Sequence, residues 1–237
     1  MELDEAILNR RSCRSYDPSK HVTVEQMREI LHYGTWAPSG TNSQPWRFTV
    51  LSGKAKDDFI TFHRTDLENK KSSMSEQSAN IALWSCTSLE KSDIVVLVWD
   101  KEKGVVSQQG IGACIQTMML KAHGIGIGSL WVAAVRWSKD EITAKYSHKD
   151  WELIAGVGFG YPSEKMIGKK GPPRLPVDEI GVPLLIINAN YQYLSARAAP
   201  NASTSQEAIR VHQLQAYWGK RRGKQYSSYS MAKANST

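Results

Sequence analysis

The sequence predicts a fold in which helices pack against a sheet of buried strands. Residues 93–99 and 153–159 are almost continuously apolar, which is typical of strands buried on both faces. Residues 107–123 have the length of a helix and so few polar side chains that we expect burial on several sides. One α/β domain followed by a tail accounts for these elements as well as two small domains would.

The composition is that of a folded protein with an excess of positive charge. The chain has 237 residues, of which 41% are hydrophobic and 22% charged, so it is long enough to bury one sizeable core. Its formal net charge of +7 points to nucleic acid, an acidic membrane surface or small anionic ligands as partners. Part of this excess belongs to the end of the chain, at Lys220, Arg221, Arg222 and Lys224.

Several kinds of site and location are disfavoured. The three cysteines are too sparse for a disulfide framework and, with no signal peptide in the sequence, indicate a reducing, cytoplasmic setting. No apolar run is long enough to cross a bilayer, so no membrane partner is expected. The histidines lack H-x-x-x-H spacing and the cysteines lack C-x-x-C spacing, so we expect no metal site built by the protein.

Three arginines, Arg10, Arg11 and Arg14, crowd around Ser12 after a short predicted helix whose apolar side is formed by Leu3, Ala6, Ile7 and Leu8. Like charges packed this closely repel unless an anion lies among them, and the guanidinium fork fits phosphate in bidentate fashion. A phosphate-bearing ligand is therefore one hypothesis. The other is a solvated basic turn at the end of a helix, where cations suit the helix dipole, and composition alone favours this second interpretation.

The next segments predict a helix, a rigid loop and a strand. Thr23 and Gln26 form a capping-box pattern at the start of a helix that ends near Gly34. Residues 36–46 form a loop, because two prolines and a glycine prevent a regular helix or a central strand. The loop presents Ser, Asn and Gln side chains with free backbone amides, so a binding role and a plain surface connection both stay open. The alternation in residues 47–51 predicts a strand.

The middle of the chain predicts two further helices before the buried strand and the long apolar helix. In residues 54–92 a charged helix and a less regular apolar helix flank a polar segment, and the region is either a mobile lid or an insertion. Small residues would let another helix approach residues 107–123 closely, so this helix belongs to the core or to a dimer interface. The glycines after it have the spacing of a helix end, not of a dinucleotide fingerprint.

The last third of the chain turns from apolar to basic and then to polar. After strands at 129–132 and 153–159, residues 169–176 form a proline-stiffened basic loop that could reach the same anion as the arginine cluster. The composition shifts near residue 190. Residues 195–205 are interpreted as a linker, residues 206–218 as one amphipathic helix, and the final residues as disordered.

Several separated segments together resemble the nitroreductase superfamily of FMN flavoproteins. The first is Arg10-Arg11-Ser12-x-Arg14-x-Tyr16, and the second is Ala37-Pro38-Ser39-Gly40-x-Asn42-x-Gln44-Pro45-Trp46. The third is Gly112-Ala113-x-Ile115-Gln116-x-Met118-x-Leu120, followed by Gly124-x-Gly126-x-Gly128-Ser129. The last are Gly158-x-Gly160-Tyr161-Pro162 and Arg174-x-Pro176-x-Asp178-Glu179. In this order the segments cover most of residues 3–182.

The resemblance implies a fold and an assembly. The fold is an α+β sandwich, with a mixed or antiparallel central sheet flanked by helices, in an intertwined homodimer. One FMN-binding domain would span residues 1–190, followed by a basic C-terminal extension over residues 191–237. Residues 183–187 could be a strand donated to the partner subunit, and the extension a linker with a helix that wraps it.

The resemblance also assigns roles around an FMN bound at the dimer interface. Arg10, Arg11, Ser12 and Arg174 would hold the phosphate and ribityl chain, and Arg14 would face the pyrimidine edge of the flavin, where a cation stabilises negative charge. One subunit would contact the flavin ring through Gly128, Ser129 and Leu130, and the other through Pro38, Ser39, Gly40, Asn42 and Gln44. Neighbouring arginines are expected to lower the pKa of Cys13, although a packing role is favoured over a nucleophilic one.

The implied function is that of an FMN-dependent oxidoreductase. NADH or NADPH would reduce the flavin, and a nitroaromatic, quinone or similar small acceptor would reoxidise it in a ping-pong cycle. No catalytic side chain is expected, because the flavin carries the chemistry. One alternative keeps the flavin but acts as a dehydrogenase or oxidase of a biosynthetic pathway, with oxygen as acceptor. An alternative of another class is nucleic-acid or protein binding through the basic tail, which is disfavoured because short charged tails are usually solvated.

Overall fold

The computed structural model describes residues 1–146, 150–176 and 179. The chain divides into two compact units, Met1–Pro172 and Pro173–Thr237. The helices and strands discussed here belong to the first unit. The predicted donated strand, linker and tail helix lie outside the described residues. In the described part of the chain, every helix is too short or too polar to cross a membrane.

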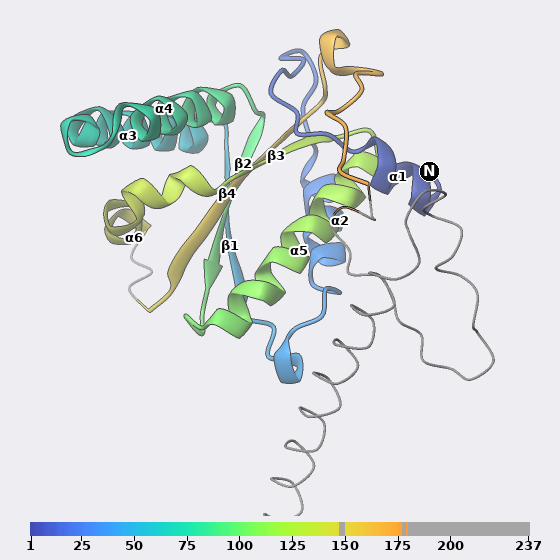
Figure 1. Cartoon of the computed structure of the whole chain (residues 1–237), viewed down its shortest axis with the longest axis horizontal. Helices are drawn as coiled ribbons and strands as arrows, with labels where there is room; N and C mark the ends of the chain where they lie inside the picture. The colour runs from blue at the N-terminus through green and yellow to red at the C-terminus, as the bar shows by residue number, and fades with distance from the viewer. Residues whose placement is uncertain (147–149, 177–178, 180–237) are drawn as a thin grey trace, which may run out of the picture. The chain divides into compact units, whose positions relative to one another are not determined.

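Four strands form an antiparallel sheet in the order β1-β2-β4-β3 (Figure 1). They are β1 (Trp46–Ser52), β2 (Ile94–Asp100), β3 (Gly128–Val132) and β4 (Glu152–Gly160). Every residue of β2 is buried, as its β-branched run predicts. A parallel bridge between Ser12 and Ser129 extends the sheet at its β3 edge. The predicted α+β fold with a mixed or antiparallel central sheet is therefore confirmed.

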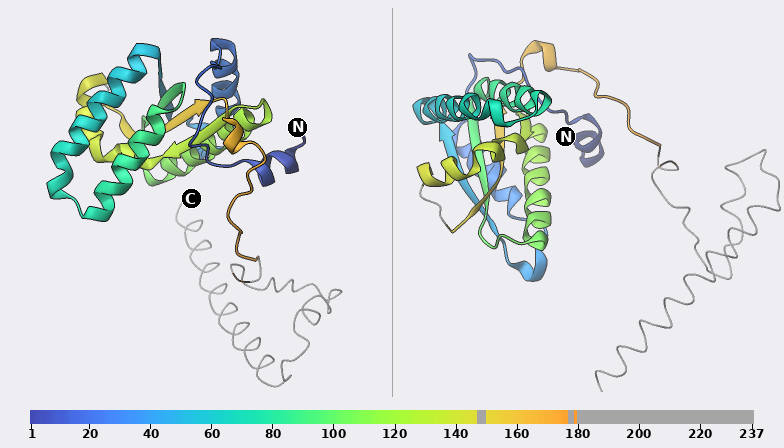
Figure 2. Two further views of the ribbon diagram at one scale, coloured as in Figure 1. Left: turned by 90° about the horizontal axis from the view of Figure 1, so that it is seen from above. Right: turned by 60° about the vertical axis from the view of Figure 1, so that its left-hand side comes forward.

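Helices cover both faces of the sheet (Figure 1). On one face lie α2 (Val24–Gly34) and α5 (Val105–Gly124), and on the other α3 (Gly53–Lys70), α4 (Glu76–Glu90) and α6 (Lys139–Tyr146). Strand β2 serves both cores because its side chains alternate: Val96 and Val98 join the α2–α5 core, whereas Leu97 and Trp99 join the other. Figure 2 shows α3 and α4 lying side by side as an antiparallel pair.

A local sequence signal accounts for the start of α2. Thr23 Oγ1 accepts the N–H of Gln26 at 3.2 Å and Gln26 Oε1 accepts the N–H of Thr23 at 2.9 Å, which completes the predicted capping box of α2. Helices α3 and α4 confirm the prediction of two helices in residues 54–92, joined by the short 3₁₀ turn η2 (Lys71–Ser73). Helix α6 and the 3₁₀ turn η3 (Ala133–Ser138) were not predicted.

The helix predicted before the arginine cluster is present as α1 (Leu3–Asn9), but little of its apolar side is packed. Of its residues only Ala6 is buried, whereas Leu3 and Leu8 are 67% and 68% exposed. A helix of only two turns can bury one side chain against its neighbours, but it is too short to bury a whole apolar face. Most of the apolar side of α1 is therefore left uncovered by the described residues.

His63 of α3 is a buried imidazole in the core on the α3–α4 face. Its side chain is stacked on Phe59, with ring centroids 5.7 Å apart, and its Nδ1 lies 2.8 Å from Ser138 Oγ. Burial lowers the pKa of His63 to about 4, and the nearby charge of Asp66 only partly opposes this effect. At pH values between its ordinary pKa and this lowered pKa, the unfolded chain therefore binds a proton at His63 that the folded chain does not bind.

We expect this difference to make the fold less stable as the pH falls from about 6.5 to about 4. The contribution of His63 is at most roughly 3 kcal/mol, since each pKa unit corresponds to about 1.4 kcal/mol. Urea unfolding at neutral and acidic pH should show a smaller loss of stability in His63→Gln than in the wild type. The matched variant His21→Gln, at an exposed histidine, should keep the full loss. Equal losses in all three proteins would contradict the prediction.

Candidate functional site

The residues after α1 run along the β3 edge of the sheet. The N–H of Cys13 donates to the carbonyl of Ser129 at 2.9 Å, and the N–H of Asp17 donates to the carbonyl of Tyr161 at 2.8 Å. Ser12 pairs with Ser129 in the parallel bridge. Backbone hydrogen bonds thus fix this segment at two points. They bring Ser12 and Ser129, two predicted site residues far apart in the sequence, to the same place.

Gly128 lets the two segments approach this closely. A Cβ atom at this position would lie 2.8 Å from both Cβ and Sγ of Cys13 and 3.1 Å from Cγ of Pro162. Cys13 is buried, and desolvation raises the pKa of its thiol more than the charge of Arg14 lowers it. The expected lowering by a neighbouring arginine is present for Arg14, but burial outweighs it and leaves the pKa of Cys13 above its ordinary value. Cys13 acts as a packing residue, as expected.

We expect Gly128→Ala to destabilise the fold by about 1–3 kcal/mol, because overpacking a tight contact forces the backbone apart. Thermal unfolding should show a lower Tm than in the wild type. Gly124→Ala is the matched control, since a Cβ there would meet nothing within 4 Å. If the two variants unfolded at the same temperature, the close contact between Gly128 and Cys13 would not limit which side chain the fold tolerates at position 128.

Buried polar atoms gather around the arginine cluster. Among the described residues, Arg11 Nε, His123 Nε2 and Ser129 Oγ are buried without a hydrogen-bond partner. His123, near the end of α5, has its pKa lowered first by burial and then by the charges of Arg10 and Arg11. Such atoms need partners, because leaving a buried polar group unsatisfied costs free energy. An anionic group with several oxygens, such as a phosphate, would supply them and balance the arginine charges.

Arg11 has a second role at the end of α1. Its Nη1 donates to the carbonyl oxygens of Leu8 and Arg10, both at 2.7 Å. A cation at this position suits the helix dipole. The interpretation of the cluster as a basic helix end therefore holds for Arg11. Gly171 packs directly against the Arg11 side chain, so the start of the second basic loop, which belongs to the first unit, lies beside the cluster.

The environment of Arg14 differs from that of Arg10 and Arg11. Its side chain is exposed, and its Cζ atom lies 4.9 Å from the centroid of the Trp84 ring on α4. A guanidinium at this distance from an indole makes a cation–π contact. Leu130, the third of the β3 residues predicted to contact the ring, is buried in the core beneath α4.

The loop predicted to contact the flavin ring is strained and well fixed. Its 3₁₀ turn, η1 (Gly40–Asn42), is followed closely by Gln44. Thr41, Asn42 and Gln44 have φ values of 51°, 58° and 47° in the left-handed region, which costs non-glycine residues about 1 kcal/mol or more each. Ser39 Oγ holds the turn closed by accepting the N–H of Gln44 at 3.1 Å. Backbone strain of this kind is concentrated at functional sites.

Within one chain this loop does not join the arginine cluster. A Cβ at Gly110, near the start of α5, would lie 3.3 Å from Pro38 O and 3.4 Å from Ser39 Cβ. The cluster lies instead near the end of α5, beside His123. Helix α5 has 20 residues, or about 30 Å, and Figure 1 shows the loop and α1 at its opposite ends. Arg174 belongs to the second unit, so its predicted return to the phosphate is untested.

Two residues of this region, His123 and Trp84, were not predicted from the sequence. His123 lies more than one hundred positions from the arginines whose charges it feels, and Trp84 is seventy positions from Arg14. No local pattern marks such pairs. The one available signal was the aromatic side chain itself in an otherwise irregular stretch of residues 79–89.

Comparison with known proteins gives a consistent result. The profile of the Nitroreductase family matches residues 7–161. The oxygen-insensitive NAD(P)H nitroreductase of Salmonella typhimurium is 42% identical over 59 residues, which are 24% of this chain and 27% of that protein. Nitroreductase NfnB of Mycolicibacterium smegmatis is 24% identical over 197 residues, covering 68% of this chain and 83% of that protein. The crystal structure of the FMN-dependent nitroreductase NfnB from Mycobacterium smegmatis in complex with NADPH has a TM-score of 0.62 and 21% identity, covering 76% of this chain and 96% of that chain.

These similarities differ in what they establish. The chain spans about a quarter of the length of the first curated relatives it matches, 26% and 27%. The solved structure, at 21% identity, shows a common fold. The family profile goes further, since residues 7–161 include the arginine cluster, the strained loop, α5 and the sheet. The chain belongs to the nitroreductase family.

Proposed function

We propose that the protein is an FMN-dependent oxidoreductase. Arg10, Arg11 and Ser12, together with Arg174, would hold the phosphate and ribityl chain, and Arg14 would lie at the pyrimidine edge of the flavin. The observation that carries this proposal is the cluster of buried polar atoms from Arg11, His123 and Ser129, which lack partners among the described residues. His123 joins the predicted set as a neutral neighbour of the phosphate.

The protein would bind and orient the cofactor, and no side chain is proposed as acid or base. Bound FMN would accept two electrons from NADH or NADPH and pass them to a nitroaromatic, quinone or similar small acceptor, in a ping-pong cycle. Arg14 would stabilise the negative charge that develops at the pyrimidine edge, because a fixed cation needs no reorganisation when that charge appears. Gly128 and Ser129 would set the position of the ring, whereas Leu130 could act on it only through its backbone, because its side chain is buried in the core beneath α4.

A flavin absorbance scan tests the proposed function. The purified protein should carry a flavin spectrum, and NADH or NADPH should bleach it under anaerobic conditions. A protein that is colourless and takes up no added FMN would contradict the proposal. A flavin that neither nucleotide bleaches would instead favour a dehydrogenase or oxidase that returns electrons to oxygen.

We also propose that the working form is a homodimer. A single chain places Pro38, Ser39, Gly40, Asn42 and Gln44 at the opposite end of α5 from the arginine cluster, so the loop could reach the flavin only from a second copy. The uncovered side of α1 and the exposed Val105 and Val106 of α5 offer apolar surface for the contact. The dimer would therefore form two identical sites, each completed by both subunits.

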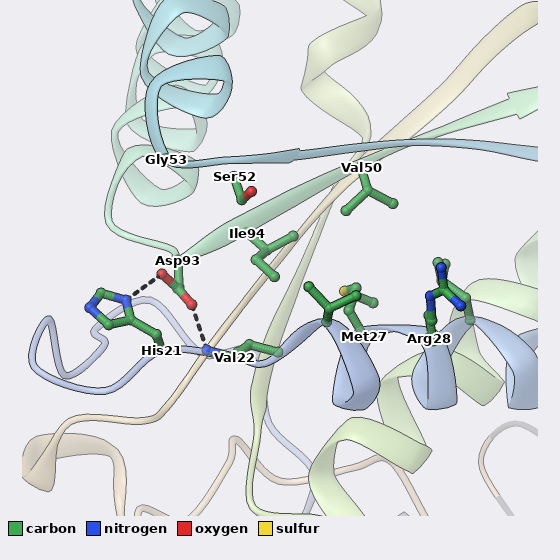
Figure 3. A pocket seen from close by; sticks show the side chains of 11 residues that line it. His21, Val22, Met27, Arg28, Val50, Ser52, Gly53, Asp93 and Ile94 are labelled. Atoms are coloured by element: carbon green, nitrogen blue, oxygen red, sulfur yellow. Dashed lines mark hydrogen bonds and ion pairs between the residues drawn. The ribbon is translucent and has the colours of Figure 1, made fainter.

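The unpaired side of β1 supports the proposal that residues 183–187 of one subunit bind to the other as a strand. Strand β1 pairs with β2 on one side, and no described strand pairs with its other side. A groove of about 580 Å³ lies between α2 and β1, lined by apolar residues such as Val22, Met27 and Val50 (Figure 3). Within its lining Asp93 accepts the N–H of Val22 at 2.6 Å and contacts His21 Nδ1 at 2.9 Å. Residues 183–187 of the partner, which are apolar, would fit this groove, with residues 191–237 as an extension beyond it.

A further inference from the structure

Trp84 and Arg14 form a contact that joins α4 to the arginine cluster. The Cζ atom of Arg14 lies 4.9 Å from the centroid of the indole ring, within cation–π range. Both side chains are exposed, Trp84 by 56%, so the contact lies at the surface of the first unit. Trp36 and Trp137 are also exposed, so exposure alone does not distinguish Trp84; its contact with an arginine of the cluster does.

The backbone on each side of the contact is fixed by independent packing. Helix α4 is anchored in the core through Ala82, Cys86 and Leu89, which are fully buried and share that core with Leu130 of β3. On the other side, the hydrogen bond from Cys13 to Ser129 ties the residue before Arg14 to the same strand. The indole and the guanidinium are therefore presented to one another from two segments that both pack on β3.

The indole holds the guanidinium without cancelling its charge. In the part of the chain that the structure describes, no hydrogen bond or ion pair engages the Arg14 side chain beside this contact. A carboxylate in the place of Trp84 would restrain the arginine as well, but it would neutralise the positive charge. An aromatic face restrains a cation and leaves its charge available to a third group.

We infer that Trp84 is a positioning residue for Arg14. The inference rests on the proposed function, in which Arg14 faces the pyrimidine edge of the flavin. Trp84 keeps the guanidinium oriented, fully charged, at the place where negative charge develops. It also links that orientation to the position of α4, so a displacement of this helix moves the cation away from the site.

The test compares variants that differ at one side chain. Trp84→Leu keeps an apolar side chain but removes the aromatic face, Trp84→Phe keeps a weaker face, and Arg14→Ala removes the cation. Ile81→Ala is the matched control, because Ile81 is 52% exposed on the same helix, one turn earlier, and has no cation–π contact with Arg14. Circular dichroism and Tm should be close to wild type in all four, since none of these side chains is buried.

The first measurement needs no flavin. In ¹⁵N relaxation of arginine side chains, the Arg14 Nε–H should be ordered in the wild type and in Ile81→Ala, partly ordered in Trp84→Phe, and mobile in Trp84→Leu. An exposed cation–π contact corresponds to about a two- to fivefold preference for the docked rotamer. If the Arg14 signal in Trp84→Leu is as ordered as in the wild type, the inference is wrong.

The second measurement uses the protein saturated with FMN. The rate of flavin reduction by NAD(P)H in stopped flow should fall about two- to fivefold in Trp84→Leu, recover in part in Trp84→Phe, and stay at the wild-type value in Ile81→Ala. Trp84→Leu should add no further loss to Arg14→Ala, because both changes act through the same cation. A loss that adds to that of Arg14→Ala, or one confined to the KM of the acceptor, would overturn the inference. Failure to bind FMN at all would instead overturn the proposed function, and the relaxation data would still decide whether Trp84 orders Arg14.

Discussion

Arg10→Ala is expected to weaken FMN binding by about 10- to 150-fold, because a hydrogen bond to a charged group is worth about 1.5–3 kcal/mol. Arg10 ends α1 beside His123, and its Nε and Nη1 atoms are buried. A half-buried guanidinium next to a second arginine is well placed to hold a phosphate in bidentate fashion. Titration of the flavin-free protein with FMN, followed by fluorescence quenching, measures the change.

The control is an arginine outside the site. Arg136 is exposed and pairs with Glu152 at 2.9 Å, so Arg136→Ala removes a positive charge without touching the cluster. Its FMN affinity should stay within about twofold of wild type, since salt screens the effect of an exposed charge that does not contact the ligand. If Arg10→Ala and Arg136→Ala lost affinity equally, general charge and not a phosphate contact would explain the loss.

The three arginines of the cluster should not behave alike. Arg11 donates to the carbonyls of Leu8 and Arg10, so Arg11→Ala should lower FMN affinity and also loosen the end of α1. Arg14 lies on Trp84 and outside the buried group, so Arg14→Ala should mainly slow flavin reduction when FMN is saturating. A loss of affinity alone in Arg14→Ala, with reduction unchanged, would contradict this division of roles.

The sequence predicted the fold well where the signal is local. Strands β2 and β4 are marked by unbroken apolar runs and helix α5 by its length and lack of a polar face, because each is buried by the rest of the chain. Helix α6 was missed, since in its eight residues only Ile142 is buried and no apolar period develops. The uncovered side of α1 could not be foreseen either, because a sequence shows which side of a helix is apolar but not what covers it.

The sequence proposed part of the candidate site but neither its full set of residues nor their arrangement. The resemblance assigned Arg10, Arg11, Ser12 and Ser129 to one ligand, and the structure brings Ser12 against Ser129. It could not reveal that burial would dominate the pKa of Cys13, because neighbours in sequence show charges but not solvent exclusion. His123 and Trp84 enter through tertiary contacts, which no spacing in the sequence encodes.

Removing residues 183–237 should convert the protein to a monomer and reduce bound FMN from stoichiometric to near none. The truncation would leave the groove between β1 and α2 open and the far edge of β1 without a strand. Val50 is already 43% exposed on this strand, so the monomer should leave the apolar groove exposed to water. Light scattering after size exclusion gives the oligomeric state, and absorbance gives the flavin content of the same fractions.

A chain that ends at residue 205 separates the strand from the basic tail. It keeps residues 183–187 but lacks the segment that holds Tyr217, Trp218, Arg221 and Arg222. We expect this variant to stay dimeric and to keep its flavin, because the groove and both halves of the site are then complete.

If this variant dissociates, the segment after residue 205 holds the subunits together, and the strand does not suffice. If it differs from the full chain only by losing salt-dependent binding to DNA or RNA, the tail has a nucleic-acid partner of its own. Loss of flavin from a chain that stays dimeric would separate assembly from cofactor binding, and would contradict the proposal that the two subunits build each site together.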